Sequence, residues 1–173
     1  MAQQTESPMK KISIAKVVLN MGVGKSGEPI EKAKRALKHI SGQQPSPRYA
    51  KATQRDWGVH KGEPIGVAVT VRNEEAITLI KRLFAAKGNQ MNGSSFDNFG
   101  NLSFGIKEHI DIPGVKYDPQ DGILGLDIAI SLTRPGFNIR FRSKHKASVG
   151  RGHIITSEDA KAFLTHEFGI QVV

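Results

Sequence analysis

The sequence predicts an α+β fold, a mostly antiparallel β-sheet with helices packed on one face, and three observations support this prediction. Ile65–Arg72 and Gly125–Thr133 alternate apolar and polar residues, as half-buried strands do. Pro29–Ile40 instead repeats its apolar residues at the spacing of an amphipathic helix. The connection between the second and third expected strands is short, which favours a hairpin and therefore antiparallel pairing.

The length and charge of the chain suggest one basic domain. Its 173 residues are enough to bury a core. We expect a flexible tail at 1–10 and a single domain over 11–173, with a basic arm at 134–151. Lys and Arg number 25 against 16 Asp and Glu, a net charge of +9. This excess suggests an anionic partner, although a solvated basic surface without a partner has the same composition.

Several classes of protein are excluded by what the sequence lacks. The absence of cysteine excludes disulfides, thiolate zinc sites and cysteine nucleophiles, and it is compatible with a reducing cytoplasm. No apolar run approaches the roughly 18 residues of a membrane helix. The polar N-terminus does not resemble a signal peptide. We therefore expect no membrane partner.

The first expected strand, Ile12–Leu19, stops in a glycine-rich turn, Asn20–Gly27, and a helix follows from about Pro29. Such a turn exposes backbone N–H groups near Gly22 and Gly24. The helix N-terminus adds partial positive charge, so the turn has a shape that can hold phosphates. The alternative is a tight strand-to-helix turn without a ligand.

Two nucleotide-binding motifs come close to this turn, and both fail. Gly22, Gly24 and Gly27 have the spacing of the dinucleotide fingerprint, but no acidic residue stands about 20 residues further on to hold a ribose. The GKS at 24–26 resembles the end of a P-loop, but Leu19 occupies the place of the glycine required five positions earlier. We therefore expect no cofactor.

The first expected helix runs from Pro29 to about Ile40, with an apolar stripe of Ile30, Ala33, Leu37 and Ile40. Its other side carries four cations, which we interpret as a solvated face: Lys32, Lys34, Arg35 and Lys38. Two prolines make Gln44–Arg48 a turn or the entry to an edge strand. A short strand around Tyr49–Thr53 is expected next.

The loop Gln54–Gly62 combines the single tryptophan of the chain with cations: Arg55, Trp57, His60 and Lys61. Rings that stack on bases, beside cations that neutralise phosphates, are typical of nucleic-acid contacts. The alternative is that Trp57 caps the core.

The strand Ile65–Arg72 has one branched apolar face and one small polar face, formed by Gly66, Ala68, Thr70 and Arg72. A phosphate backbone can lie close to such a face while Thr70 supplies a hydroxyl. The solvent face of any antiparallel sheet alternates in the same way, so this alternative stays open.

A second helix is expected to begin at Asn73 as its N-cap and to end at Gly88, with a core stripe of Ile77, Ile80, Leu83 and Phe84. Asn89–Asn101 is predicted to be a long loop. We expect Phe96 and Phe99 to anchor it by apolar packing rather than to stack on bases.

The remaining elements are a short strand at Leu102–Ile106, an irregular stretch at Ile110–Asp121 and the clear strand Gly125–Thr133. Residues 134–151 then carry six cations and no acid: Arg134, Arg140, Arg142, Lys144, Lys146 and Arg151. Such a block is typical of an arm that binds nucleic acid.

Two aromatic residues, Phe137 and Phe141, are expected to hold the root of the arm to the body. A capping box of Thr156 with Asp159 predicts the last helix, which Gly169 ends. Its apolar stripe is Ala160, Phe163, Leu164 and Phe168.

No arrangement of residues in the sequence indicates catalysis or a metal site. The six histidines are scattered, without the i, i+4 pairing of a metal-binding helix. No G-x-S-x-G elbow is present. The acidic pairs Glu74-Glu75 and Glu158-Asp159 stand at helix starts, where the helix dipole already explains them.

A resemblance to a known family covers nearly the whole chain after Lys10. Its segments, in order, are NMGVG at 20–24, SGQQP at 41–45, GEPIG at 62–66, VTVR at 69–72, SFDNFGNLSFGIKE at 95–108 and GLDI at 125–128. In this order and spacing they closely resemble ribosomal large-subunit protein five, the universal family that carries 5S rRNA. The LTRPGF at 132–137 is similar to the archaeal and eukaryotic branch.

The resemblance implies a cytoplasmic structural protein of the large ribosomal subunit, with an α+β fold whose open sheet face is available for RNA. It implies binding to 5S rRNA in the central protuberance, beside large-subunit rRNA and other proteins of that region. It also implies contacts with P-site tRNA and with small-subunit protein thirteen. Asn20, Gln43 and Thr70 match family positions that hydrogen-bond 5S rRNA. To these candidate contacts with 5S rRNA we add Arg72, Gly22 and Gly24, on the chemistry of the residues and not on the resemblance.

The family's segment between the second and third strands reaches toward the P-site tRNA. Ala50–Ala52 and Gly58–Lys61 resemble its two flanks, and the part between them is slightly shorter than in the family. We therefore expect a weaker or less ordered tRNA contact rather than none. A nucleotide-dependent enzyme that uses Gly22–Gly27 and a basic protein-binding module remain as alternatives.

Overall fold

The computed structural model describes residues 7–115, 119 and 121–173. Most of the expected tail at 1–10 therefore lies outside the described residues, and Pro8–Lys10 form a short 3-10 turn. Part of the stretch Ile110–Asp121 also lies outside, and its beginning belongs to a 3-10 turn, His109–Asp111.

The main sheet has five strands in the order β2-β3-β1-β6-β5, and all neighbours are antiparallel. Its strands are β1 Ser13–Gly22, β2 Ser46–Tyr49, β3 Pro64–Val71, β5 Leu102–Ile106 and β6 Leu126–Thr133. A second, parallel pair joins β4 Gln90–Met91 to β7 Gln171–Val172. The predicted α+β class and the hairpin of β2 with β3 are confirmed.

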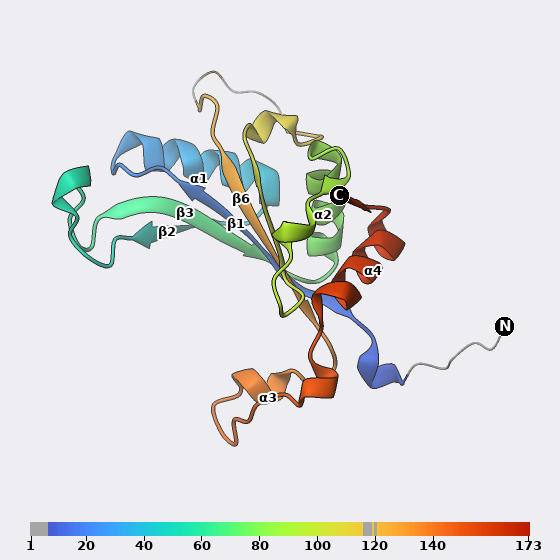
Figure 1. Cartoon of the computed structure of the whole chain (residues 1–173). Coiled ribbons are helices and arrows are strands. Elements are labelled where there is room, and N and C mark those ends of the chain that lie inside the picture. The colour runs from blue at the N-terminus through green and yellow to red at the C-terminus, as the bar shows by residue number, and fades with distance from the viewer. Residues whose placement is uncertain (1–6, 116–118, 120) are drawn as a thin grey trace.

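Among the described residues, four helices accompany the sheet: α1 Glu28–Ser41, α2 Asn73–Ala86, α3 Asn138–Phe141 and α4 Ser157–Phe168. The first contacts β3 and the second contacts β1, and both bury their apolar stripes on the same side of the sheet (Figure 1). No helix in the part of the chain that the structure describes is long and apolar enough to cross a membrane.

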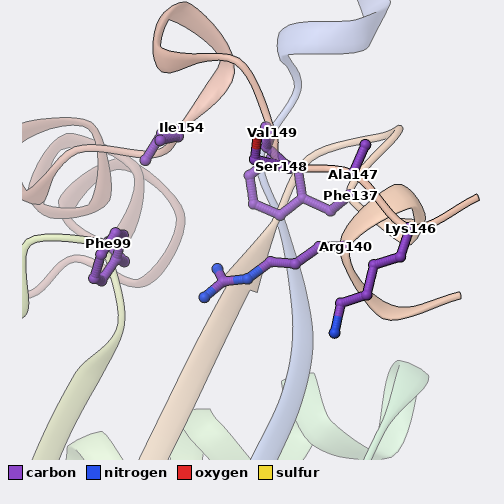
Figure 2. A pocket seen from close by; sticks show the side chains of 8 residues that line it. All are labelled: Phe99, Phe137, Arg140, Lys146, Ala147, Ser148, Val149 and Ile154. Carbon is purple, nitrogen blue, oxygen red and sulfur yellow. The ribbon is translucent and has the colours of Figure 1, made fainter.

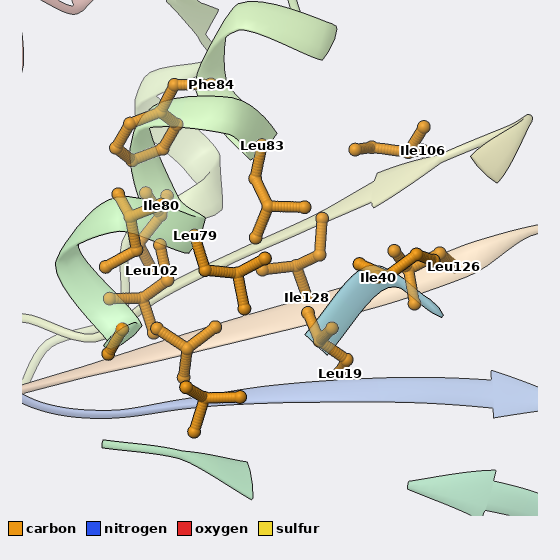
Figure 3. Close-up of a cluster of buried hydrophobic side chains, with 14 of the residues drawn as sticks. Leu19, Ile40, Leu79, Ile80, Leu83, Phe84, Leu102, Ile106, Leu126 and Ile128 are labelled. Carbon is orange, nitrogen blue, oxygen red and sulfur yellow. The ribbon is translucent and has the colours of Figure 1, made fainter. Parts of the chain in front are cut away.

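The core lies between the sheet and these helices (Figure 3). Leu19 of the central strand β1 and Ile128 of the neighbouring β6 lie there with Leu83 of α2, and all three are almost fully buried. Each such side chain contributes about 1.5–3 kcal/mol on burial. Phe84 of α2 stacks on Phe104 of β5 with ring centroids 5.7 Å apart. These contacts leave the opposite face of the sheet free of the apolar core.

Two strand boundaries differ from the prediction. The first strand continues through Asn20 to Gly22, because Met21 is buried in the core and Gly22 still pairs with Gly66. The second strand lies at Ser46–Tyr49 rather than at Tyr49–Thr53. Proline is tolerated within it because β2 is the edge strand of the sheet.

The start and the stripe of α2 also differ from the prediction. The N-cap is Arg72 rather than Asn73, which is the first residue of the helix and has a φ of 60°. Ile77 is 42% exposed, whereas Leu79 is buried. The helix is therefore rotated slightly from the predicted stripe, with Ile80, Leu83 and Phe84 still in the core.

The predicted loop Asn89–Asn101 contains β4, whose partner β7 lies far away in the sequence and could not be recognised locally. Phe96 is buried and anchors the loop as expected, but Phe99 is 54% exposed and does not. In the arm, Phe137 packs against the core, whereas Phe141 is 74% exposed. Two of the four expected aromatic anchors are thus wrong.

The predicted capping box of α4 is confirmed. The Asp159 amide donates to Thr156 Oγ1 at 3.2 Å, and the Thr156 amide donates back to Asp159 Oδ2 at 3.2 Å. Gly169 ends the helix with a φ of 66°. Ala160 and Leu164 are buried, and the two phenylalanines of the predicted stripe are partly buried.

Candidate nucleic-acid interface

The face of the sheet opposite the helices carries small and polar side chains in cross-strand rows. One row consists of Thr70, Val18, Ala129 and Ser103, which are direct neighbours across β3, β1, β6 and β5. The next row consists of Ser46, Ala68, Asn20, Asp127 and Gly105. Since neighbouring strands lie about 4.8 Å apart, each row forms a continuous shallow surface.

Asn20 lies at the centre of this face, between Ala68 on β3 and Asp127 on β6. Asn20, Asp127 and Ser103 border a hollow of about 310 Å³. Within the described part of the chain, neither Asn20 nor Asp127 has a hydrogen bond or ion pair from its side chain. The polar ends of both side chains are therefore available to a ligand.

Asp127 is a residue that the sequence reasoning missed as a site candidate. The alternation of β6 places it on the exposed polar face, which the sequence did show. Its position opposite Asn20 depends on the register of β1 with β6, and no local signal in the sequence reports that register.

Three predicted residues meet at a second hollow, of about 480 Å³, beside the same face. Gln43, Thr70 and Arg72 line it together with the first turn of α2. The Gln43 side-chain amide donates to Glu75 Oε2 at 2.6 Å, which fixes its orientation. The structure thus brings together residues that are almost 30 positions apart in the chain, on the side of Thr70 away from Asn20.

The glycine turn offers less to a phosphate than the sequence suggested. The amides of Val23 and Gly24 both donate to the Ile65 carbonyl, at 3.0 and 2.8 Å. These N–H groups are therefore used within the protein. Gly24 has a φ of 74° and needs glycine for its backbone conformation, whereas Gly22 is an ordinary strand residue paired with Gly66. This geometry favours the tight-turn interpretation.

Glu63 joins the glycine turn to the loop Gln54–Gly62. Its carboxylate accepts the His60 amide at 3.0 Å and the Ser26 hydroxyl at 2.5 Å. The hydrogen bond from the His60 backbone and then that from Ser26 hold the pKa of Glu63 below its usual value of 4.5. The two segments are therefore positioned together.

The loop itself is an ordered tip rather than a simple closure. Gln54 and Val59 exchange two backbone hydrogen bonds of 2.9 and 3.1 Å around a 3-10 turn, Arg55–Trp57. Trp57 is 79% exposed, so it does not cap the core. The cationic candidates of the loop are exposed as well. Figure 1 shows the tip (teal) beyond the end of β2 and β3.

Arg134 at the root of the basic arm is largely committed to internal bonds. Its side chain is 10% exposed and lies 3.1 Å from the Asp159 carboxylate. Its other terminal nitrogen donates to the carbonyls of His153 and Ile154, at 3.5 and 3.3 Å. It therefore ties the arm to the start of α4.

The other five cations of the arm are exposed: Arg140, Arg142, Lys144, Lys146 and Arg151. Arg142 Nε donates to the His145 carbonyl at 2.8 Å, and the Ala147 amide donates to the Ile139 carbonyl at 3.3 Å. These bonds fold the arm into a compact lobe, seen in orange below the sheet in Figure 1. No group of acidic or histidine side chains among the described residues could hold a metal ion.

The tip and the arm lie at opposite ends of β1. The arm leaves β6 beside Ser13, which pairs with Thr133, whereas the tip follows the end at which Gly22 pairs with Gly66. Ten strand residues separate these ends, or roughly 30 Å at about 3.3 Å per residue. The open face lies between them.

Comparison with known families identifies sequences similar to this chain. Residues 7–60 match the sequence model described as "Ribosomal protein L5", and residues 64–172 match the model that describes the C-terminus of the same ribosomal family. Together the two matches extend over both ends of the sheet, the tip and the arm.

Curated relatives are similar over nearly their whole length. The large ribosomal subunit protein uL5 of Nitrosopumilus maritimus is 70% identical over 172 residues, 99% of each chain. That of Cenarchaeum symbiosum is 64% identical over 165 residues, 95% of this chain and 98% of the relative. That of Pyrobaculum aerophilum is 47% identical over 165 residues, 95% and 92% of the two chains. These archaeal relatives agree with the branch that the residues at 132–137 suggested.

Proposed function

Because the chain belongs to the ribosomal protein L5 family, we propose that it binds 5S rRNA with the open face of its five-stranded sheet. Membership of this family makes it a structural protein of the large ribosomal subunit, active in translation in the cytoplasm and not an enzyme. The proposal concerns which RNA it binds and which residues bind it.

The observation that carries the proposal is the row of small side chains around Asn20, with Thr70 in the next row and Gln43 and Arg72 beside it. Folded RNA is recognised largely through its shape, its phosphates and its 2′-hydroxyl groups. Small side chains let an RNA backbone approach the sheet closely. The Asn20 amide and the Thr70 hydroxyl can then donate to and accept from ribose and base, while Arg72 neutralises a phosphate.

The two ends of the sheet extend this contact to further partners. We assign the tip, with Arg55, Trp57, His60 and Lys61, to P-site tRNA, and the exposed cations of the arm to large-subunit rRNA. Contacts with small-subunit protein thirteen and with other proteins of the central protuberance complete the set of proposed partners. The tip and the arm project from opposite ends of β1, which is roughly 30 Å long, and this separation allows two RNA molecules to be held at once.

A gel-shift titration with 5S rRNA at physiological salt tests the proposal. We expect Asn20→Ala and Thr70→Val each to weaken binding by about 0.5–1.5 kcal/mol, the net value of an ordinary hydrogen bond, with the fold intact by circular dichroism. Thr165→Val is the matched control, because Thr165 is exposed on α4, away from the sheet.

Two outcomes contradict the proposal. If Asn20→Ala and Thr70→Val both bind 5S rRNA as tightly as the wild-type protein does, the open face does not contact this RNA. Micromolar binding of NAD or ATP by calorimetry, without any shift of 5S rRNA, would favour the nucleotide-dependent alternative. Unfolding of either variant would instead assign that residue to the fold.

A further inference from the structure

The arm and the loop around Phe99 enclose a hollow of about 470 Å³ that lies away from the open sheet face. Figure 2 shows its lining, in which apolar side chains from the arm stand opposite Phe99, Arg140 reaches toward Phe99 and Lys146 extends from the arm: Phe99, Phe137, Arg140, Lys146, Ala147, Ser148, Val149 and Ile154. None of the sites described above includes Phe99, Ser148 or Val149, so the hollow is a separate feature.

Phe99 is held outward by a rigid turn. The Asp97 carboxylate accepts the amides of Phe99 and Asn101, at 2.9 and 2.7 Å, and the Asn101 side chain donates to it at 2.7 Å. Gly100 has a φ of 74°, and a Cβ there would lie 2.5 Å from Ile155 Cγ2. Since Ile155 is fully buried, the turn is pressed against the core. The exposure of Phe99 is thus a consequence of an ordered backbone.

The opposite wall is fixed as well. Phe137 packs against the core and lies edge-on to His153, with ring centroids 5.6 Å apart. The His153 ring nitrogen is 2.8 Å from the Pro135 carbonyl. Arg140 extends from this wall, and its guanidinium lies 5.8 Å from the centre of the Phe99 ring (Figure 2).

We propose that this hollow receives one unpaired base of ribosomal RNA, stacked on Phe99, with Arg140 and Lys146 on the adjoining phosphates. An aromatic ring beside cations on a positively charged segment is the arrangement that binds single-stranded nucleic acid. The arm contains no carboxylate at all, which favours an anionic occupant. The proposal rests on the proposed RNA-binding function but uses a different surface from the 5S rRNA contact.

Two short RNA probes of equal charge test it. Fluorescence anisotropy compares a single-stranded adenosine hexamer with a hexamer of the same backbone in which every site is abasic, both with the full-length protein. Base stacking is worth about 1–3 kcal/mol, so we expect the base-bearing hexamer to bind at least about fivefold more tightly. Phe99→Ala should abolish this difference.

Matched variants separate stacking from charge. Tyr49→Ala removes an exposed ring on β2 that does not line the hollow, and we expect it to keep the difference between the hexamers. Lys146→Gln should weaken both hexamers equally and reduce the slope of log affinity against log salt by about 0.7, the value for one phosphate of a single strand.

Equal affinity of the wild-type protein for the two hexamers overturns the proposal. So does an undiminished difference in Phe99→Ala, or a loss of the difference in Tyr49→Ala as large as in Phe99→Ala. The 5S rRNA titration of the same proteins keeps the two proposals apart. Phe99→Ala should shift 5S rRNA as wild type does, because the open sheet face is unchanged. If Phe99→Ala binds both hexamers equally but still binds 5S rRNA as the wild-type protein does, the result supports base binding in the hollow and leaves the 5S rRNA proposal unaffected.

Discussion

At the scale of single residues, the structure separates charges that hold the fold from charges that can meet a partner. Arg134 and Arg142 both belong to the basic arm. The first bonds Asp159 and two carbonyls from a nearly buried position, whereas the second is exposed and uses one N–H internally. Burial of an arginine requires such compensation, since an unpaired charge in the interior is costly. The sequence shows both only as cations.

Asp127 is a carboxylate in the middle of a face that we assign to RNA. Because a phosphate that approaches this carboxylate is repelled, we expect Asp127 to face a hydrogen-bond donor such as a 2′-hydroxyl or a base amino group. We expect Asp127→Asn to weaken 5S rRNA binding by about 1.5–3 kcal/mol, the value of a hydrogen bond to a charged group, although the change removes a negative charge. The measurement is a salt titration of affinity, in which the slope should stay that of wild type.

The control for this prediction is Asp111→Asn, which removes one negative charge from an exposed position outside the face. It should leave 5S rRNA affinity close to that of wild type. Tighter binding by Asp127→Asn would show that the carboxylate only repels RNA and makes no favourable contact.

At the scale of elements, short connections decide how the proposed contacts are presented. Glu63 carries the hydrogen bonds that join the tip to the glycine turn, and Asp97 does the same for the turn that exposes Phe99. In both cases one carboxylate accepts two or more hydrogen bonds, at least one of them from a backbone amide of the loop. Such loops keep an exposed aromatic residue ordered without burying it.

Glu63→Gln should loosen the tip. The neutral side chain accepts the His60 amide and the Ser26 hydroxyl more weakly than a carboxylate does. We expect faster hydrogen exchange at the His60 amide, with exchange in α2 unchanged as the internal control. A wild-type exchange rate at His60 would show that the backbone pairing of Gln54 with Val59 suffices to order the tip.

The same bond predicts a pH dependence in the wild-type protein. The pKa of Glu63 is lowered on folding, so its contribution is fully present above the unfolded value of 4.5 and is lost as the pH falls through the lower, folded value. Protection of the His60 amide should therefore decrease only below about pH 4.5. Loss of protection near neutral pH would point to another titrating group.

The arm should supply salt-dependent affinity that does not depend on sequence. Replacing Arg140, Arg142, Lys144 and Lys146 together with Gln removes four exposed cations. We expect this change to reduce the slope of log affinity against log salt concentration, measured with large-subunit rRNA fragments. The reduction should be about 0.7–0.9 for each phosphate that the variant no longer neutralises. The control replaces four lysines on or beside the helices, with the same change in net charge: Lys32, Lys34, Lys38 and Lys87. An unchanged slope in the arm variant, or an equal change in the control, contradicts the prediction.

At the scale of the whole molecule, the sheet acts as a spacer between two projections. Its helices and core lie on one side, its open face on the other, and the tip and arm extend from opposite ends of β1 (Figure 1). A rigid sheet of this kind fixes the distance between the proposed tRNA contact and the proposed contact of the arm with large-subunit rRNA. Because the resemblance predicts a tip slightly shorter than in the family, we expect a shorter reach at that end.

Cross-linking from P-site tRNA in intact ribosomes tests this arrangement. We expect adducts within Arg55–Lys61 and none in the arm, because roughly 30 Å separates the two ends. Quenching of Trp57 fluorescence by iodide in the free protein should be efficient, since the side chain is 79% exposed. Adducts only in the arm or on α4 would reject the assignment of the tip.

The sequence by itself determined β1, β3, β5, β6, the three longer helices and much of the core. The alternation in β3 and β6, the apolar stripe of α1 and the capping box of α4 are local patterns, because each depends on which side of one strand or helix is buried. The family resemblance likewise depends on the order of short segments along the chain. The antiparallel pairing of the second and third strands was also predicted; β3 needed a shift of one residue, whereas β2 lies almost wholly before its expected position.

Only the tertiary structure decided which of these residues meet. The pairing of Asn20 with Asp127, the pairing of β4 with β7 and the commitment of Arg134 to Asp159 join positions that are distant in the sequence. Each depends on strand register or helix placement, which the packing of the whole core selects. Exposure of Phe99 beside Arg140 has the same origin: an apolar residue signals burial locally, and only the turn held by Asp97 and pressed on Ile155 directs it outward.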